Sequence, residues 1–188
     1  MLSFEKWSIK TDNDTLTIEG DRVSWEKADR TVIRYISKQL EISDDFHHSF
    51  FICILEGEVE DELNRGFIRL WEIRNDWGNR AWIYARKDGD GWTIHFEQLS
   101  DPKEVITFHG SSQLHFKNRY YVQISHSMGI YRLVVKDHKG LMVEDSGELK
   151  GVPSDYSLIW LASTIKSRRN NGNWSSGYIE GLTITQTR

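Results

Sequence analysis

The stretch Arg80–Gln98, RAWIYARKDGDGWTIHFEQ, decides the fold. Along Arg80–Arg86 every second residue is small or apolar and the residues between are aromatic or charged, and Trp92–Gln98 repeats this alternation. Between these two runs, Asp88–Gly91 has the composition of a tight turn. Since neighbouring residues of a strand point to opposite faces of a sheet, the sequence predicts two antiparallel strands joined by a hairpin.

The same period of two recurs along most of the chain, with turn signals such as Met128-Gly129 and Lys139-Gly140 between the runs and no helical period. Phe46–Leu55 is apolar on both faces, so we expect it to cross the centre of a sandwich. The number of short strands favours an all-β, two-sheet antiparallel jelly-roll sandwich over a smaller immunoglobulin fold. The predicted strands are Leu16–Ile18, Thr31–Ser37, Phe46–Leu55, Gly66–Ile73, Ala81–Arg86, Trp92–Gln98, Val105–His109, Tyr120–Ser125, Tyr131–Asp137, Leu141–Asp145, Ser157–Ser163 and Gly177–Thr185.

Length and composition limit the classes of function. The 188 residues, with no linker, repeat or low-complexity tract, fit one domain over residues 1–188. The aromatic content of 12%, including eight Trp, is high and favours strands and recognition surfaces. The net charge of −4, without a basic stripe, argues against nucleic acid as a partner.

The cellular compartment stays open. Cys53 is the single cysteine and lies in an apolar run, so we expect a buried thiol and no intrachain disulfide. Met1–Lys10 has no apolar signal-peptide core, and no segment is long and apolar enough for a membrane span. The sequence therefore predicts either a cytoplasmic protein or an excised extracellular domain.

The alternation also predicts a sheet face rich in polar and aromatic side chains. Aromatic rings can stack on the apolar C–H patches of a pyranose, and fixed polar groups can bind its hydroxyls. The bland alternative is that a long loop or a partner subunit covers these rings. The candidate ligand-binding residues on this face are Arg69, Trp71, Trp82, Tyr84, Arg86, His95, Glu97 and Gln123.

Two polar segments add candidates at the rim of the same face. Asn75–Arg80 places Trp77 among side-chain amides, and Lys166–Gly177 does the same for Trp174. Polar loops on rigid scaffolds often carry function, so Trp77 and Trp174 are also predicted to contact the ligand, with simple packing as the alternative for Trp174.

The order of several features is familiar. A Phe-x-x-Trp segment at Phe4–Trp7, Asp45-Phe46 before the long apolar strand, Tyr121–Ile124 before Tyr131–Val135, and the closing Gly177–Ile184 recur together in one superfamily. By this layout the chain resembles the concanavalin A-like lectin and glucanase superfamily, and within it the laminin G-like modules. The resemblance implies two curved antiparallel sheets, with ligands on the concave sheet or at its rim loops. The superfamily includes lectins, carbohydrate-binding modules, glycoside hydrolases, polysaccharide lyases and protein-adhesion domains.

An enzyme of this fold is the first alternative function. The Glu-x-Asp-x-Glu motif of laminarinase-like glycoside hydrolases is absent, and the nearest spacing, Glu56–Glu60, is interpreted as a solvated acidic loop. A lyase needs a Tyr or His base near an Arg, and Tyr84, His95, Arg69 and Arg86 are the residues that could provide them. No catalytic residue is assigned, and we favour a protein without enzymatic activity.

Metal binding has little support in the sequence. His47 and His48 are adjacent and diverge across a strand, and no zinc-like spacing is present. Calcium is the one candidate ion, because relatives use it at loops and Asp12–Asp14, Asp44-Asp45 and Asp88–Asp90 offer oxygen ligands, although none forms a complete set. No cofactor is therefore predicted, with calcium kept as an open alternative.

The sequence thus favours a non-catalytic, lectin-like carbohydrate-binding module for a glycan or polysaccharide. The remaining alternative is a protein-adhesion or assembly domain that forms a homo-oligomer through the same face. The glycan hypothesis depends on Trp71 and Trp82 emerging together on one open face. In that case Trp71→Ala and Trp82→Ala should each weaken glycan binding by about 1 to 3 kcal/mol.

Overall fold

The computed structural model describes residues 2–11, 16–29, 34–58, 67–75, 78–88, 91–100, 104–151, 156–164 and 174–186. These residues form strands and turns without a helix, and so include no helix of the length and apolarity that a membrane crossing requires. The strands are β1 (Ser8–Thr11), β2 (Leu16–Glu19), β3 (Arg22–Asp29), β4 (Arg34–Ile42), β5 (Phe46–Glu58), β6 (Phe67–Arg74), β7 (Arg80–Asp88), β8 (Gly91–Ser100), β9 (Glu104–His109), β10 (Arg119–Ser127), β11 (Ile130–Lys136), β12 (Met142–Asp145), β13 (Leu149–Lys150), β14 (Tyr156–Thr164) and β15 (Trp174–Gln186).

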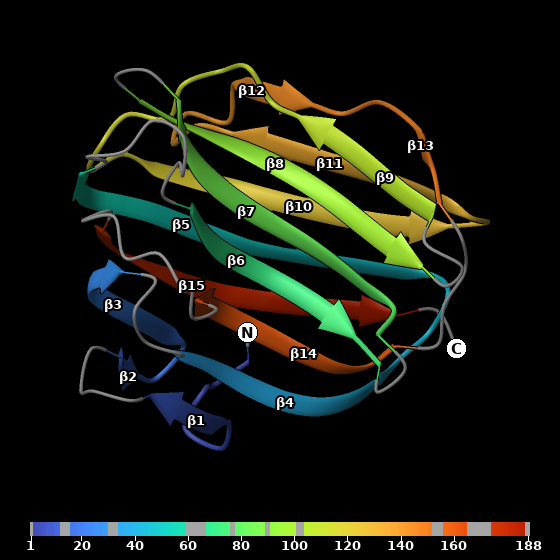
Figure 1. Ribbon diagram of the computed structural model, residues 1–188, viewed down its shortest axis with the longest axis horizontal. Helices are drawn as coiled ribbons and strands as arrows, with labels where there is room; N and C mark the ends of the chain where they lie inside the picture. The colour runs from blue at the N-terminus through green and yellow to red at the C-terminus, as the bar shows by residue number, and fades with distance from the viewer. Residues whose placement is uncertain are drawn as a thin grey trace.

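The strands form two antiparallel sheets packed face to face. Sheet A has the order β1-β4-β14-β6-β7-β8-β9, and sheet B has the order β12-β11-β10-β5-β15-β3-β2, with β13 paired to β11. In Figure 1 the green strands β6 to β8 of sheet A cross in front of β5 and β10 of sheet B. The predicted all-β sandwich is confirmed, and β5 lies between β10 and β15 in the interior of sheet B, as its apolar sequence predicts.

The hairpin predicted from Arg80–Gln98 is also confirmed. β7 and β8 pair in register from Arg80↔Leu99 to Asp88↔Gly91. A second predicted turn, Met128-Gly129, joins β10 to β11 with φ angles of 49° and 75°. Two consecutive residues in the left-handed region give a turn whose twist matches that of the strands it connects.

Several strand boundaries differ from the predicted ones. β1 and β3 were not predicted, because β1 is exposed and charges in β3 obscure the alternation of its buried Val23 and Trp25. β5 continues to Glu58, so Glu56–Glu58 extends a strand and does not belong to the predicted acidic loop. β15 begins at Trp174, which places this residue in a strand and corrects its assignment to a loop.

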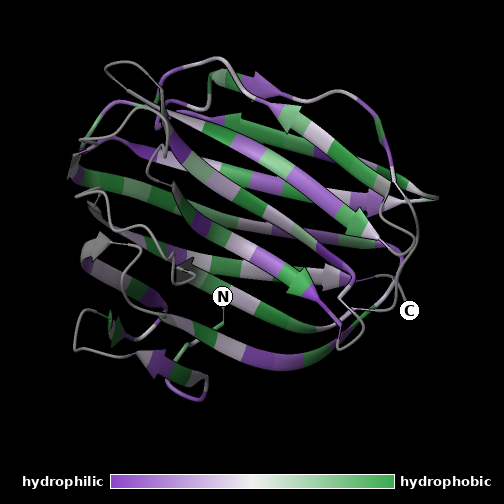
Figure 2. Cartoon of the chain, viewed as in Figure 1, coloured by the Kyte–Doolittle hydropathy of each residue, from purple (hydrophilic) through white to green (hydrophobic). Residues whose placement is uncertain are grey.

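One hydrophobic core joins the inner faces of both sheets. Its largest fully buried side chains include Trp25, Trp71 and Trp92. Figure 2 shows hydrophobic and hydrophilic residues alternating along most strands, as a sandwich with one wet face per sheet requires. Within the core, the Gln98 side-chain amide donates hydrogen bonds to the hydroxyls of Tyr131 and Tyr156, at 3.3 and 3.1 Å, so this buried polar group links the two sheets.

A β-bulge in β6 decides which of its side chains leave the core. Against β7, Arg69 pairs with Tyr84 but Trp71 pairs with Ile83, so β6 carries one extra residue at Leu70. The adjacent strand β14 is also irregular, with Ala162 at a φ of 50°. Because of the extra residue, Leu70 and Trp71 are both fully buried, and the alternation of β6 changes phase beyond this point.

Candidate ligand-binding site

The predicted position of Trp71 on a ligand-binding face is wrong. Its side chain is 0% exposed within the core, where the indole Nε1 donates a hydrogen bond to Nδ1 of His48 at 3.2 Å. The bulge at Leu70 turns this residue inward, whereas strict alternation would have placed it beside Arg69. Trp71 is therefore a core residue and offers no surface to a ligand.

The other predicted residues of β6, β7 and β8 do share the outer face of sheet A. The register aligns Arg69 with Tyr84 and Tyr84 with His95, and it aligns Trp82 with Glu97. Their neighbours along the strands, such as Ile83, lie in the core, so these side chains point away from sheet B. The structure thus brings together Arg69, Trp82, Tyr84, Arg86, His95 and Glu97.

This outer face contains a shallow depression, here named the sheet A hollow. It has a volume of about 260 Å³ and is lined by Arg69, Trp82, Tyr84, Arg86 and Glu97. Every lining residue was a candidate from the sequence. The hollow is smaller than the roughly 300 Å³ at the lower end of drug-sized pockets, so its dimensions suit one small group or one unit of a polymer.

The aromatic rings of the hollow are covered more than the sequence suggests. Trp82 and Tyr84 are each 7% exposed. The guanidinium carbons of Arg69 and Arg80 lie 5.3 and 4.8 Å from the centroid of the Trp82 ring. The hollow therefore presents guanidinium groups in addition to ring edges, and this differs from the open aromatic platform that stacking on a sugar would use.

Glu72 occupies the outward position that the sequence prediction gave to Trp71. Its side chain is 0% exposed, and its Oε2 accepts a hydrogen bond from Nη1 of Arg69 at 3.0 Å. Trp160 lies across from Glu72 in β14, stacked on Tyr35 at 4.0 Å and under the guanidinium of Arg74 at 4.5 Å. The sequence signal for this arrangement is the adjacent apolar pair Leu70-Trp71, which breaks the alternation.

Two buried arginine nitrogens of this face have no hydrogen-bond partner among the described residues. Arg69 is 8% exposed, and neither its Nε nor the buried Nε of Arg80 has a hydrogen-bond partner among the described residues. Burial lowers the pKa of Arg69, while the Glu72 carboxylate acts in the opposite direction. A buried donor without an acceptor is costly, by about 1 to 3 kcal/mol, so these atoms are suited to an acceptor supplied by a ligand.

The remaining polar groups of the hollow hold one another in place. The Tyr84 hydroxyl donates a hydrogen bond to Oε1 of Glu97 at 2.6 Å. Burial and this bond raise the pKa of Tyr84, so its phenol stays protonated near neutral pH. His95 stacks on Tyr84 with a centroid distance of 5.0 Å, and its ring nitrogens lie 2.6 Å from Oγ1 of Thr93 and 3.1 Å from Nδ1 of His109.

The groups that line the hollow can be compared with those that cleavage of a glycosidic bond uses. Glycoside hydrolysis needs two carboxyl groups across a sugar, and Glu97 is the single carboxylate among the residues that line the hollow. A protonated Tyr84 is a hydrogen-bond donor and a poor base. Chemically, the hollow offers charged donors, one carboxylate acceptor and partly covered aromatic rings.

Three further sequence candidates do not join the hollow in the described structure. Gln123 lies in β10, paired with Ser49 and Val134, so its prediction on the same face is wrong: it belongs to the outer face of sheet B. Alternation separates two faces but does not say which sheet a strand enters. Trp77 and the side chain of Trp174 lie outside the described residues.

The described residues bring no three His, Cys, Asp or Glu side chains together as a metal site. Asp45 uses its Oδ1 to accept a hydrogen bond from the Met128 amide at 3.3 Å. Asp12–Asp14 lies outside the described residues, as do Gly89-Asp90. Calcium binding at these segments stays a prediction.

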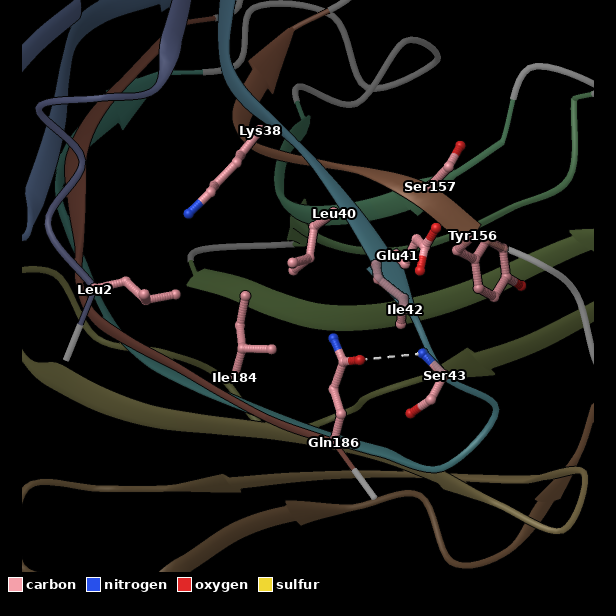
Figure 3. A pocket seen from close by; sticks show the side chains of 10 residues that line it. All are labelled: Leu2, Lys38, Leu40, Glu41, Ile42, Ser43, Tyr156, Ser157, Ile184 and Gln186. Carbon is pink, nitrogen blue, oxygen red and sulfur yellow. Dashed lines mark hydrogen bonds between the residues drawn. The ribbon is translucent and has the colours of Figure 1, made fainter. Parts of the chain in front are cut away.

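A cavity larger than the hollow lies elsewhere, where the sandwich opens between β4, β14 and β15. This terminal cleft has a volume of about 900 Å³. In Figure 3, Lys38 extends toward Leu2, and Gln186 accepts a hydrogen bond from the Ser43 amide at 3.3 Å. No candidate from the sequence lines this cleft, and none of the partnerless buried polar atoms found in the described residues belongs to it. Its lining residues are Leu2, Lys38, Leu40, Glu41, Ile42, Ser43, Tyr156, Ser157, Ile184 and Gln186.

No protein-family model and no curated protein sequence matches this chain. Solved structures do resemble it. A functionally unknown protein from Saccharomyces cerevisiae aligns over 99% of each chain with a TM-score of 0.65 and 10% identity. A legume lectin-like domain from Entamoeba histolytica aligns with a TM-score of 0.61 and 10% identity, over 97% of this chain and 90% of the other.

An alginate lyase from Klebsiella pneumoniae is also similar, with a TM-score of 0.60 and 8% identity, over 76% of this chain and 60% of the lyase. This chain therefore matches less than two thirds of the length of that enzyme. At such low identities the comparisons show the fold alone. The chain has a concanavalin A-like jelly-roll fold, as its sequence predicts, and this fold serves carbohydrate-related functions in other proteins.

Proposed function

We propose that the protein is a non-catalytic carbohydrate-binding module that holds a glycan or polysaccharide in the sheet A hollow. The observation that carries this proposal is Arg69, which is 8% exposed at the hollow and has a buried Nε without a partner among the described residues. A sugar hydroxyl or an acidic substituent that displaces the side chains covering this nitrogen would supply the missing acceptor. The lectin-like neighbour of the same fold supports a glycan over other ligands.

The remaining groups of the hollow complement a sugar. Arg69 and Arg86 are donors toward ring and hydroxyl oxygens, and Glu97 is an acceptor for a hydroxyl hydrogen. Trp82 holds two guanidinium groups in place next to its ring. These side chains stand on three adjacent strands, so the site is rigid before a ligand arrives, which lowers the entropic cost of binding.

A lyase is the second candidate function, because Tyr84, His95, Arg69 and Arg86 do share this face. Incubation with a panel of uronate-containing polysaccharides tests it through the absorbance of unsaturated products. Turnover that stops in Tyr84→Phe would establish an enzyme. The assembly alternative predicts instead a concentration-dependent oligomer in sedimentation and no glycan binding.

Glycan-array binding followed by titration calorimetry tests the proposal, with arms that contain calcium or a chelator. Trp82→Ala removes the ring that supports Arg69 and Arg80, and we expect the loss of correctly placed guanidinium hydrogen bonds to weaken glycan binding by about 1 to 3 kcal/mol. Tyr121→Ala, an aromatic residue of the sheet B outer face, is the matched control and should bind normally. Circular dichroism is to be used to check that both variants fold.

Two outcomes contradict the proposal. One is that the wild-type protein binds no glycan in either arm of the array. The other is that folded Trp82→Ala binds like the wild type while Tyr121→Ala loses its affinity, which would place the site on sheet B.

A further inference from the structure

The outer face of β6, β7 and β8 carries a charge opposite to that of the whole chain. Its described charged side chains are the arginines Arg69, Arg74, Arg80 and Arg86 and the glutamates Glu72 and Glu97. Four positive and two negative groups leave this face positive, whereas the chain as a whole has a formal net charge of −4. A local positive field on an acidic protein favours an anionic ligand at this place.

Both carboxylates of the face are already engaged inside the protein. Glu72 accepts from Nη1 of Arg69 through Oε2, while its Oε1, which has no hydrogen-bond partner among the described residues, lies 3.7 Å from Nη1 of Arg74. Glu97 accepts from the Tyr84 hydroxyl at 2.6 Å. The protein therefore supplies acceptors to part of the arginine donors, while the buried Nε atoms of Arg69 and Arg80 have none among the described residues.

The aromatic rings orient these arginines. Arg80 lies 4.8 Å above the Trp82 ring, and Arg74 lies 4.5 Å above the Trp160 ring. A guanidinium held over a ring keeps its N–H groups directed sideways, in the plane of the fork. That planar fork matches the paired oxygens of a carboxylate or of a sulfate ester better than a single sugar hydroxyl.

We propose that the glycan bound in the sheet A hollow is anionic, and that its carboxylate or sulfate oxygens are bound by Arg69 and Arg86, which line the hollow, and by Arg80, which lies beside it over the Trp82 ring. This inference rests on the proposed function and specifies the class of its ligand. Attraction by overall charge does not account for such binding, since a polyanion meets a chain with a net charge of −4. The recognition must therefore be local to the arginines of this face.

Matched polymers test this inference on the intact protein. Dextran, carboxymethyl-dextran and dextran sulfate share one backbone and differ in their charged groups. Polygalacturonate and its methyl ester form a second matched pair. In affinity electrophoresis we expect an anionic polymer of a matched set to bind at least about tenfold more tightly than its neutral partner. Comparison of carboxymethyl-dextran with dextran sulfate shows whether the arginines recognise a carboxylate or a sulfate.

Charge-removing variants locate the effect. Arg80→Gln and Arg86→Gln should each weaken anionic binding by about tenfold and change neutral binding little. Arg132→Gln is the matched control, because Arg132 lies on the outer face of sheet B and pairs with Asp145 at 2.5 Å. Anionic binding should also weaken as ionic strength rises, since salt screens exposed charges.

Each other outcome overturns a defined part of the argument. Equal binding of charged and neutral partners overturns the anionic inference and leaves the proposed function standing. Absence of binding to every polymer here and to every glycan of the array overturns both. Anionic binding that falls as much in Arg132→Gln as in folded Arg80→Gln and Arg86→Gln overturns the assignment to the hollow.

Discussion

The two outer faces of the sandwich use the same residue types to different ends. On sheet B, Arg119 lies 3.7 Å over the Phe51 ring and Arg22 lies 4.4 Å over the Tyr178 ring, much as Arg80 lies over Trp82 on sheet A. Both sheet B arginines reach Glu180, at 2.8 and 2.6 Å, and their side chains are 47% and 42% exposed. Both arginines are thus paired with the same carboxylate and remain largely exposed to solvent, while Glu180 itself is 13% exposed.

Sheet A buries Arg69 and Glu72, and the Arg69 Nε and the Glu72 Oε1 have no hydrogen-bond partner among the described residues. Arg69 and Glu72 have side-chain exposures of 9% and 0%. Exposed ion pairs contribute about 0 to 1 kcal/mol each, whereas buried polar groups carry a desolvation penalty that only suitable partners offset. The comparison teaches that an arginine on an aromatic ring is not by itself a site. Burial together with incomplete pairing distinguishes the face to which a ligand would bind.

The largest expected effect comes from breaking the buried pair of sheet A. Arg69→Met leaves the Glu72 carboxylate buried without its closest cation, and we expect the free energy of unfolding to fall by about 3 to 5 kcal/mol. Arg132→Met breaks the pair with Asp145 on sheet B, where Arg132 is 54% exposed, and should cost at most about 1 kcal/mol. Urea denaturation measures both values.

The double variant Arg69→Met/Glu72→Leu sharpens this test. If burial of an unpaired charge causes the loss, removal of Glu72 should restore most of the stability. A double variant as unstable as Arg69→Met would show instead that the methylenes of Arg69, packed against Trp82, carry the effect.

The sequence predicted the parts of this face that depend on local alternation. The β7–β8 hairpin follows from an unbroken period of two and a short turn, so Trp82, Tyr84, Arg86, His95 and Glu97 were placed together correctly. Their residue types alone do not reveal how far the arginines cover the rings. That coverage depends on side-chain conformations that the packed structure determines.

Two errors in the predicted site have different physical origins. Trp71 was misplaced because a bulge shifts the alternation, and the bulge depends on pairing with both β7 and β14. Gln123 was misplaced because alternation does not say which sheet receives a strand. The bulge also explains why Glu72 and Trp160 were missed, because their outward positions follow from the register beyond it.

The two adjacent histidines of β5, His47 and His48, differ in burial, and the buried one makes the stability of the fold depend on pH. His48 is 0% exposed, and burial lowers its pKa to about 3, while His47 lies at the partly exposed outer position beside it. Because the folded pKa lies below the unfolded value of about 6.5, the unfolded state takes up the proton first as pH falls. Stability from this group is present above about pH 6.5 and is lost progressively as the pH falls toward about 3.

Between about pH 8 and about pH 4 this loss amounts to about 3 kcal/mol. His48→Asn removes the titration and keeps an oxygen acceptor for the Trp71 indole, so its free energy of unfolding should depend less on pH than that of the wild type. His47→Asn is the comparison variant: burial is the larger cause of the lowered pKa of His48 and the neighbouring His47 the smaller one, so His47→Asn should reduce the pH dependence less than His48→Asn does. An unchanged slope in His48→Asn would show that His48 does not titrate between the folded and unfolded states.

Glu97→Gln is expected to strengthen the binding of an anionic ligand at the hollow, whereas removal of an arginine weakens it. The amide oxygen can still accept from the Tyr84 hydroxyl, but the negative charge next to the arginines is gone. If the ligand is anionic, we expect binding to tighten by about 0.5 to 1 kcal/mol at low salt, with Glu180→Gln on sheet B unchanged. Weaker binding of the anionic polymer by Glu97→Gln would show that the carboxylate accepts a hydrogen bond from the ligand.

Substitutions in the terminal cleft should affect glycan binding least. The cleft is larger than the hollow, but none of the buried polar atoms without a partner among the described residues lines it. Leu40 lines this cleft, and Leu40→Trp adds an indole to an open volume of about 900 Å³ without touching the outer face of sheet A. We therefore expect titration calorimetry to give the same glycan affinity for Leu40→Trp and the wild type, within about twofold. A large loss of affinity in this folded variant would move the binding site to the cleft, because cavity size would then matter more than the Arg69 Nε of the hollow, which has no hydrogen-bond partner among the described residues.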